Sequence, residues 1–257
     1  MTMKVNKSLL KMLIFTAILV IVLSIGVSAE PPLPIPKIGL EIDTADNPED
    51  VALSIQILFL LTILSLAPAL LVMVTSFTRV IIVLSFTRNA LGTQQMPPNQ
   101  VLIGLALFIT FFIMNPVITD INTNAFQPYT QGEITQEQAI TKAMDPIRNF
   151  MLKNVKEKDL ALFLNLSETE QPVKSSDIPT SALIPAFIIS ELKTAFIIGF
   201  YLYIPFIMID MVVSSTLMSM GMMMLPPVMI SLPFKLLLFV MVDGWNLIVK
   251  SLVMSFN

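Results

Sequence analysis

Long stretches of apolar residues dominate the chain and predict helices that cross a membrane. The first stretch after the N-terminal region spans residues 51–74, and the second spans about 101–117. A third runs from residue 182 to about 218, and a fourth from about 228 to 254. An α-helix needs roughly 20 apolar residues to span a bilayer. The pattern therefore predicts an all-α protein that passes the membrane several times.

Prolines lie inside these stretches and predict bent helices, because proline removes a backbone donor and clashes with the preceding turn. We expect two long, kinked helical hairpins, 51–119 and 181–257. The prolines concerned are Pro68, Pro116, Pro185, Pro205 and Pro233.

Arg79 and Arg88 are the only charged residues between the first two apolar stretches. Cytoplasmic connections of membrane proteins are enriched in Arg and Lys, so we expect these two arginines to be cytoplasmic-side anchors. The interval is largely apolar, however. The alternative is a first helix that continues to Leu91, where Gly92 would end it.

Residues 1–29 have the layout of a secretory signal peptide. An apolar core at 13–22 follows a basic start, and small residues lead up to Ala29, where we expect cleavage. The alternative is an uncleaved first membrane helix, since the apolar run could nearly span a bilayer. Residues 30–50 are acidic and rich in proline, which predicts an extended exported arm. The basic residues of the signal peptide are Lys4, Lys7 and Lys11.

Residues 120–180 are more polar than the segments around them, with nine acidic and six basic residues. Turn signals lie at 131–132 and 171–172. Apolar positions between Ala139 and Met151 recur at helical spacing and predict an amphipathic helix, and 160–166 predicts another. We expect a small helical domain on the extracytoplasmic side.

Composition argues against an enzyme. The chain is 55% hydrophobic and only 13% charged, whereas a soluble domain has about 25% charged residues. It contains no His and no Cys, which removes the usual catalytic triads and the commonest zinc sites. No nucleotide-binding G-x-x-x-x-G-K-[ST] loop is present. We therefore expect no catalytic residue, cofactor or metal, and the absence of a basic face argues against nucleic acid.

Six charged residues interrupt the last two apolar stretches, where each would cost at least about 2.5–3.5 kcal/mol near the bilayer centre. An antiparallel hairpin turning near residue 223 brings Asp210 level with Lys235. The same geometry brings Glu191 level with Lys250. Pairing within the chain, pairing between subunits and a proton relay are the three interpretations. The charged residues are Glu191, Lys193, Asp210, Lys235, Asp243 and Lys250.

The connection between these stretches, MGMMMLPP at 220–227, carries no charge. Methionine is flexible and polarizable, so it fills irregular gaps and repacks easily. A ring of such loops could also seal a pore, because apolar constrictions exclude water. Composition alone favours gap filling. The loop residues are Met220, Gly221, Met222, Met223 and Met224.

Two long passages resemble the FliP family of flagellar type III secretion proteins. They are MVTSFTRVIIVLSFTRNALGTQQMPPNQVLIGLALFITFFIMNPV (73–117) and, from residue 183, LIPAFIISELKTAFIIGFYLYIPFIMIDMVVSSTLMSMGMMMLPPVMISLPFKLLLFVMVDGWNLIVKSL. The resemblance extends over nearly all of the chain after Val51. It implies a subunit of the export gate in the flagellar basal body, a multi-pass protein of the inner membrane. Several copies would assemble with FliQ-like and FliR-like subunits, beside export proteins of the FlhA and FlhB type, and pass unfolded flagellar proteins outward.

The resemblance also implies roles for single residues. The loop of Met220, Gly221, Met222, Met223 and Met224 would form a gasket around the pore, in place of the gap filling that composition favours. Glu191 of the ISELK motif would bridge to Lys235 of a neighbouring copy, rather than to Lys250. Asp210 would act in assembly or export, and we expect a structural role for Asp243 as well. The competing classes are an ion- or proton-coupled transporter that uses these carboxylates, and a scaffold that lines no pore.

Overall fold

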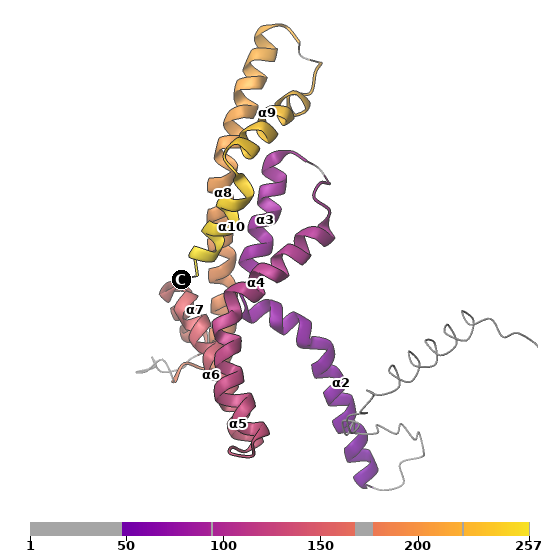
Figure 1. Cartoon of the computed structure of the whole chain (residues 1–257), viewed down its shortest axis with the longest axis vertical. Coiled ribbons are helices and arrows are strands. Elements are labelled where there is room, and N and C mark those ends of the chain that lie inside the picture. Colours follow the sequence, from indigo (N-terminus) through magenta and orange to yellow (C-terminus); the bar gives the residue numbers. More distant parts are fainter. Residues whose placement is uncertain (1–47, 94, 168–176, 223, 257) are drawn as a thin grey trace, which may run out of the picture. The chain divides into compact units, whose positions relative to one another are not determined.

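The computed structural model describes residues 48–93, 95–167, 177–222 and 224–256, and the regular secondary structure in these ranges is helical (Figure 1). The predicted all-α fold is confirmed. Contacts divide the chain into residues 1–55 and residues 56–257. Of the first unit the structure describes only the start of one helix, and the second unit carries the candidate site. The predicted signal peptide with its cleavage at Ala29, and residues 30–47 of the predicted arm, lie outside the described residues.

Two helices are long and apolar enough to cross a membrane, namely Asn99–Thr130 and Thr180–Ser219. Up to four spans result if each of two bent helix pairs counts as one. The first pair, Ile55–Leu66 and Pro68–Val74, bends by 48°, which confirms the kink predicted at Pro68. The number and order of these segments agree with the four predicted apolar stretches.

The first helix, α2 (Pro48–Val74), includes the last three residues of the arm predicted for residues 30–50. Residues 48–50 are therefore helical, contrary to the prediction of an extended arm up to that point. A separate helix, α3 (Phe77–Leu91), follows after a short break, so α2 does not run on to Leu91. Gly92 ends α3 with φ +75°, a left-handed conformation that glycine adopts without strain.

The second stretch forms α4 (Asn99–Ile121). Contrary to expectation it does not end near residue 117, because the helix continues through a π-helical turn, η1 (Asn122–Phe126), into α5 (Gln127–Thr130). The turn predicted at 131–132 is present, with Gly132 at φ +75°. The turn signal at 171–172 lies outside the described residues.

Both helices predicted for the polar region are present, as α6 (Gln136–Asn154) and α7 (Glu157–Leu166). A capping box starts α6, in which the Gln138 amide donates to the Thr135 hydroxyl at 3.4 Å and the Thr135 amide donates to the Gln138 side chain at 3.1 Å. Within the same compact unit, α6 packs against α4, η1 and α8, and α7 packs against α8.

The last two stretches form α8 (Thr180–Ser219), α9 (Pro227–Met241) and α10 (Gly244–Met254). Pro233 lies inside α9, and the 62° bend falls between α9 and α10 instead. The bend occurs there because Asp243 adopts a left-handed conformation, φ +50°. A Cβ atom on the next residue, Gly244, would lie 2.3 Å from the Phe239 ring, so the close approach of α10 to α9 needs a glycine.

The core positions α3 against the long helix α8. Val83 and Leu84 of α3 are fully buried in one cluster with Ala195 of α8. A second cluster joins α6 to the first half of α8 through Met151, Leu183 and Phe187. Figure 1 shows α3 beside α8 above the α6–α7 pair. Helix α10 joins the first cluster through Ile248 and Leu252. Helix α9 contacts the end of α3, and Phe206 of α8 and Phe239 of α9 belong to the first cluster. The end of α8 and the loop that leads into α9 project beyond α3 (Figure 1).

Candidate functional site

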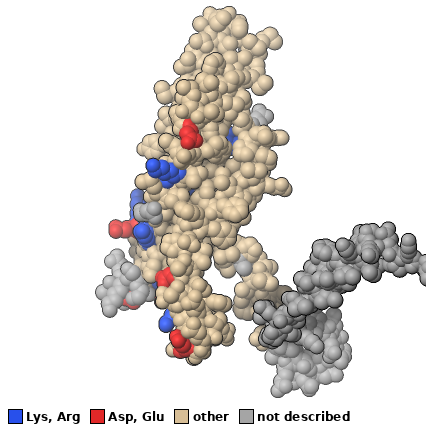
Figure 2. Space-filling model, viewed as in Figure 1, with Lys and Arg blue, Asp and Glu red and all other residues tan. Residues whose placement is uncertain are grey.

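The tip of the α8–α9 hairpin is apolar and exposed. No charged residue occurs between Asp210 and Lys235, and Figure 2 shows this end of the molecule without Lys, Arg, Asp or Glu on the visible face. At the turn, Met220 is 71% exposed and Met224 is 99% exposed. Exposed apolar patches of this kind mark contact surfaces. The methionines described at the tip do not pack into the core of this chain, which is contrary to the gap-filling interpretation.

The turn itself depends on Gly221, which has φ +73° with nothing within 4 Å of its Cβ position. Its amide donates to the Met218 carbonyl at 3.1 Å, and the Met222 amide donates to the Leu217 carbonyl at 3.0 Å. Met222 is 36% exposed, and Met223 lies outside the described residues. Two hydrogen bonds thus close the end of α8 and leave the loop free to point outward.

A charge cluster of a buried lysine and a partly exposed aspartate ties the base of this hairpin together. The Lys235 ammonium donates to Asp210 Oδ2 at 2.6 Å, and the Ser231 hydroxyl donates to Asp210 Oδ1 at 2.5 Å. Lys235 is 3% exposed. The expectation that Asp210 and Lys235 lie at the same level is confirmed, and their pairing fixes α9 against α8. A carboxylate with two such partners is satisfied within the chain.

Glu191 pairs with a residue that the sequence did not suggest. The Arg79 Nε donates to Glu191 Oε2 at 2.9 Å, and Arg79 Nη2 donates to Glu191 Oε1. Arg79 Nη1 donates to the backbone oxygen and the hydroxyl of Ser255, both at 3.0 Å. The guanidinium carbon lies 3.7 Å from the centre of the Phe256 ring. One arginine therefore connects α3, α8 and the end of the chain.

This cluster changes two expectations. Glu191 does not pair with Lys250, which is exposed on α10, and no part of Glu191 is accessible to solvent. From the sequence we expect Arg79 to be a cytoplasmic-side anchor. It is 3% exposed and acts within this chain as a buried ion-pair partner. The sequence indicates only that Arg79 stands in an apolar interval, where an arginine needs a carboxylate, and it does not identify Glu191 as that carboxylate. Arg88, at the last turn of α3, donates to the Asn99 side chain at 2.5 Å.

The predicted bridge between Glu191 and Lys235 is not formed within the chain, because Arg79 and Asp210 engage the two groups. A bridge between copies stays a prediction, and it requires both groups to exchange partners. Asp243 is exposed at the break between α9 and α10. Among the described residues, no three His, Cys, Asp or Glu side chains lie close enough to hold a metal ion.

A third cluster lies where α7 meets α8. Asp159 is 2% exposed, accepts from the Ser190 hydroxyl at 2.9 Å and pairs with Lys193. The Ser190 hydroxyl also accepts from the Lys156 amide at the start of α7, at 3.0 Å. The hydrogen bond from Lys193 is the main cause that holds the pKa of Asp159 below its ordinary value, and burial opposes it only in part. Sequence reasoning identifies Lys193 as a costly charge but not its partner.

Comparison with known proteins gives a consistent result. The sequence model described as the FliP family matches residues 60–252. The flagellar biosynthetic protein FliP of Bacillus subtilis (strain 168) is 58% identical over 217 residues, which cover 84% of this chain and 98% of that protein. FliP of Pectobacterium carotovorum subsp. carotovorum is 56% identical over 204 residues, 79% of each chain. FliP of Treponema pallidum (strain Nichols) is 50% identical over 234 residues, 90% of this chain and 86% of the relative.

Proposed function

The chain belongs to the FliP family, and from that premise we propose that it is a pore-forming subunit of the flagellar protein export gate. The single observation that carries the pore-forming role is the exposed, uncharged methionine tip of the α8–α9 hairpin. A soluble surface would place polar residues there, whereas a seal needs apolar side chains that other chains can cover. Catalysis has no part in this function.

The tip works as a gasket formed by equivalent loops of several copies. Apolar side chains around a narrow opening exclude water and ions, because dewetting closes such a constriction. The flexible methionine side chains deform around an unfolded polypeptide of any sequence and close again behind it. The loop residues of this gasket are Met220, Gly221, Met222, Met223 and Met224.

Assembly with further copies and with FliQ-like and FliR-like subunits covers the apolar faces that a single chain leaves open. On α8, Met208 and Met211 are 62% and 65% exposed, and on α9, Phe234 is 55% exposed. The energy for export comes from partners of the FlhA and FlhB type. The complex lies in the basal body, in the inner membrane, where the apolar helices of this chain are soluble.

The bridge between Glu191 of one copy and Lys235 of the next belongs to the same proposal. It forms only if assembly releases Glu191 from Arg79 and Lys235 from Asp210. A charge exchange, Glu191→Lys with Lys235→Glu, distinguishes the bridge between copies from the ion pairs within one chain. Restored assembly in the double variant supports the bridge between copies. A defect in the double variant at least as deep as in either single variant favours the contacts within the chain.

The gasket is tested by replacing the four methionines of the loop with alanine in cells. We expect intact assembly, a raised ion conductance of the membrane and impaired motility. Met254→Ala is the matched control, because Met254 is 62% exposed but lies at the other end of the α9–α10 segment. Normal conductance with normal secretion in the loop variant would show that the methionines seal nothing.

The transporter alternative predicts instead that Asp210→Asn abolishes a pH-coupled flux while the complex stays assembled.

A further inference from the structure

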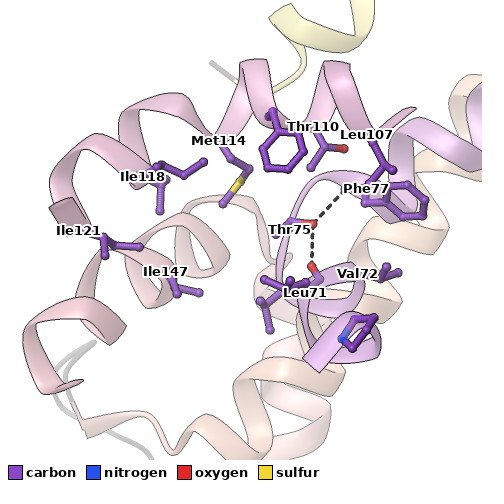
Figure 3. Close-up of a pocket in the computed structure, with 14 residues that line it drawn as sticks. Leu71, Val72, Thr75, Phe77, Leu107, Thr110, Met114, Ile118, Ile121 and Ile147 are labelled. Carbon is purple, nitrogen blue, oxygen red and sulfur yellow. Dashed lines mark hydrogen bonds between the residues drawn. The ribbon is translucent and has the colours of Figure 1, made fainter. Parts of the chain in front are cut away.

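An apolar cavity lies between the end of α2, the start of α3, and α4, away from the α8–α9 hairpin. Its volume is about 320 Å³. Figure 3 shows Leu71 and Val72 on one side and Met114 and Ile118 on the other. Ligand pockets in proteins have volumes of roughly 300–1,000 Å³. The cavity is therefore large enough for a ligand, and its lining selects an apolar one.

The polar groups in the lining are few, and one has no partner. Thr75 donates to the Leu71 carbonyl at 2.8 Å and accepts from the Phe77 amide at 3.4 Å, as the dashed lines in Figure 3 mark. Thr110 is only 7% exposed, lines the cavity, and its hydroxyl makes no hydrogen bond. A buried hydroxyl without a partner is costly. The hydroxyl oxygen has almost no accessible surface, so a mostly apolar ligand with one hydrogen-bond acceptor reaches it when the Thr110 side chain turns toward the cavity.

The surface of α2, which borders the cavity, indicates which kind of ligand surrounds it. Four consecutive residues of α2, Leu58, Phe59, Leu60 and Leu61, are 66%, 65%, 58% and 55% exposed. Successive residues turn by about 100° around a helix, so these four cover its whole circumference. Residues 51–78 contain no charge. A helix segment that is apolar on every side and exposed in its own chain is typical of a membrane span.

We propose that this cavity holds one acyl chain of a membrane phospholipid, and that the Thr110 side chain turns toward the cavity and donates a hydrogen bond from its hydroxyl to the ester carbonyl of that chain. The alkyl part lies between α2 and α4, against Leu71 and Met114. The lipid fills the space that α2 leaves open and joins the two helices. This role does not depend on the proposed function of the hairpin.

The test uses the full-length protein purified in detergent and a phospholipid that carries a photoreactive diazirine on one acyl chain. Mass mapping of the adducts identifies the labelled residues. We expect adducts concentrated on cavity residues such as Leu71 and Met114, and competition by unlabelled phospholipid. Val117→Phe narrows the cavity with a larger side chain and should lower the yield there about tenfold. Ile103→Phe is the matched control, because Ile103 is an exposed residue of the same helix that does not line the cavity.

A second variant keeps the test independent of folding defects. Thr110→Val preserves shape and removes the hydroxyl, so the yield at limiting lipid should fall about twofold to tenfold. Adducts spread evenly over α2 and α4, unchanged by any of these substitutions, would overturn the proposal. A photoreactive residue can also replace Leu71 in intact membranes. Adducts of this residue with another protein, and none with lipid, would likewise overturn the proposal.

Discussion

Removing Glu191 should destabilise the chain more than any other single change at its charge clusters. Glu191→Leu leaves the Arg79 guanidinium buried, still bonded to Ser255 at 3.0 Å but without a counter-charge. Loss of one partner from a buried ion pair costs about 3–5 kcal/mol. For a chain of this size, each kcal/mol corresponds to roughly 2–4 °C in melting temperature. The expected fall is therefore roughly 6–20 °C.

The double variant Arg79→Met with Glu191→Leu should recover most of this loss, because replacing both members of a buried pair by apolar residues is often close to neutral. Thermal unfolding of the purified protein, followed by the fluorescence of its single tryptophan, Trp245, measures both changes. A fall of less than about 3 °C in Glu191→Leu would refute the reasoning. The reasoning would also be refuted if Arg79→Met and Glu191→Leu each lowered the melting temperature and the double variant lost the sum of the two, since paired groups must show coupling.

Two further predictions concern packing and pH. Gly199→Ala should destabilise by about 1–3 kcal/mol, because its Cβ would lie 2.6 Å from Cγ of Phe86. Gly104→Ala, with nothing within 4 Å, should instead stabilise α4 by about 0.5–1 kcal/mol, and thermal unfolding of both variants checks the contrast. Because Lys193 lowers the pKa of Asp159, the attachment of α7 is fully stabilised above the ordinary pKa of 3.8 and is lost as pH falls through the lower folded value. Hydrogen exchange of α7 between pH 5 and pH 2 should show this loss, and an unchanged profile in Lys193→Met would contradict it.

The apolar stretches predict the number and order of the candidate membrane segments, because apolar length is a local property of the sequence. They do not predict the separate helix α3 or the division of the last stretch into α9 and α10. The kink at Pro68 follows from the same local reasoning and is present. The same reasoning assigns the bend in the last stretch to Pro233, but that bend arises from the left-handed Asp243 and from the contact of Gly244 with Phe239. That contact depends on how α10 packs, which no periodicity reveals.

The charge clusters show the same division between local and tertiary information. The pair Asp210–Lys235 could be predicted because a hairpin fixes which residues lie level. The partner of Glu191 could not, because Arg79 is 112 residues away in the sequence. A pairing over such a distance depends on the packing of α3 on α8, which an apolar pattern common to all the helices does not specify.

Cross-linking a stalled export substrate to the hairpin tip tests the central claim most directly. A photoreactive amino acid replaces Met222 at the tip, or Met254 as the control, in cells that export a flagellar subunit fused to a domain that cannot unfold. The pore-lining account predicts that the stalled chain cross-links to position 222 and not to position 254. If position 222 gives adducts only with lipid, while secretion continues, the hairpin does not line the export path.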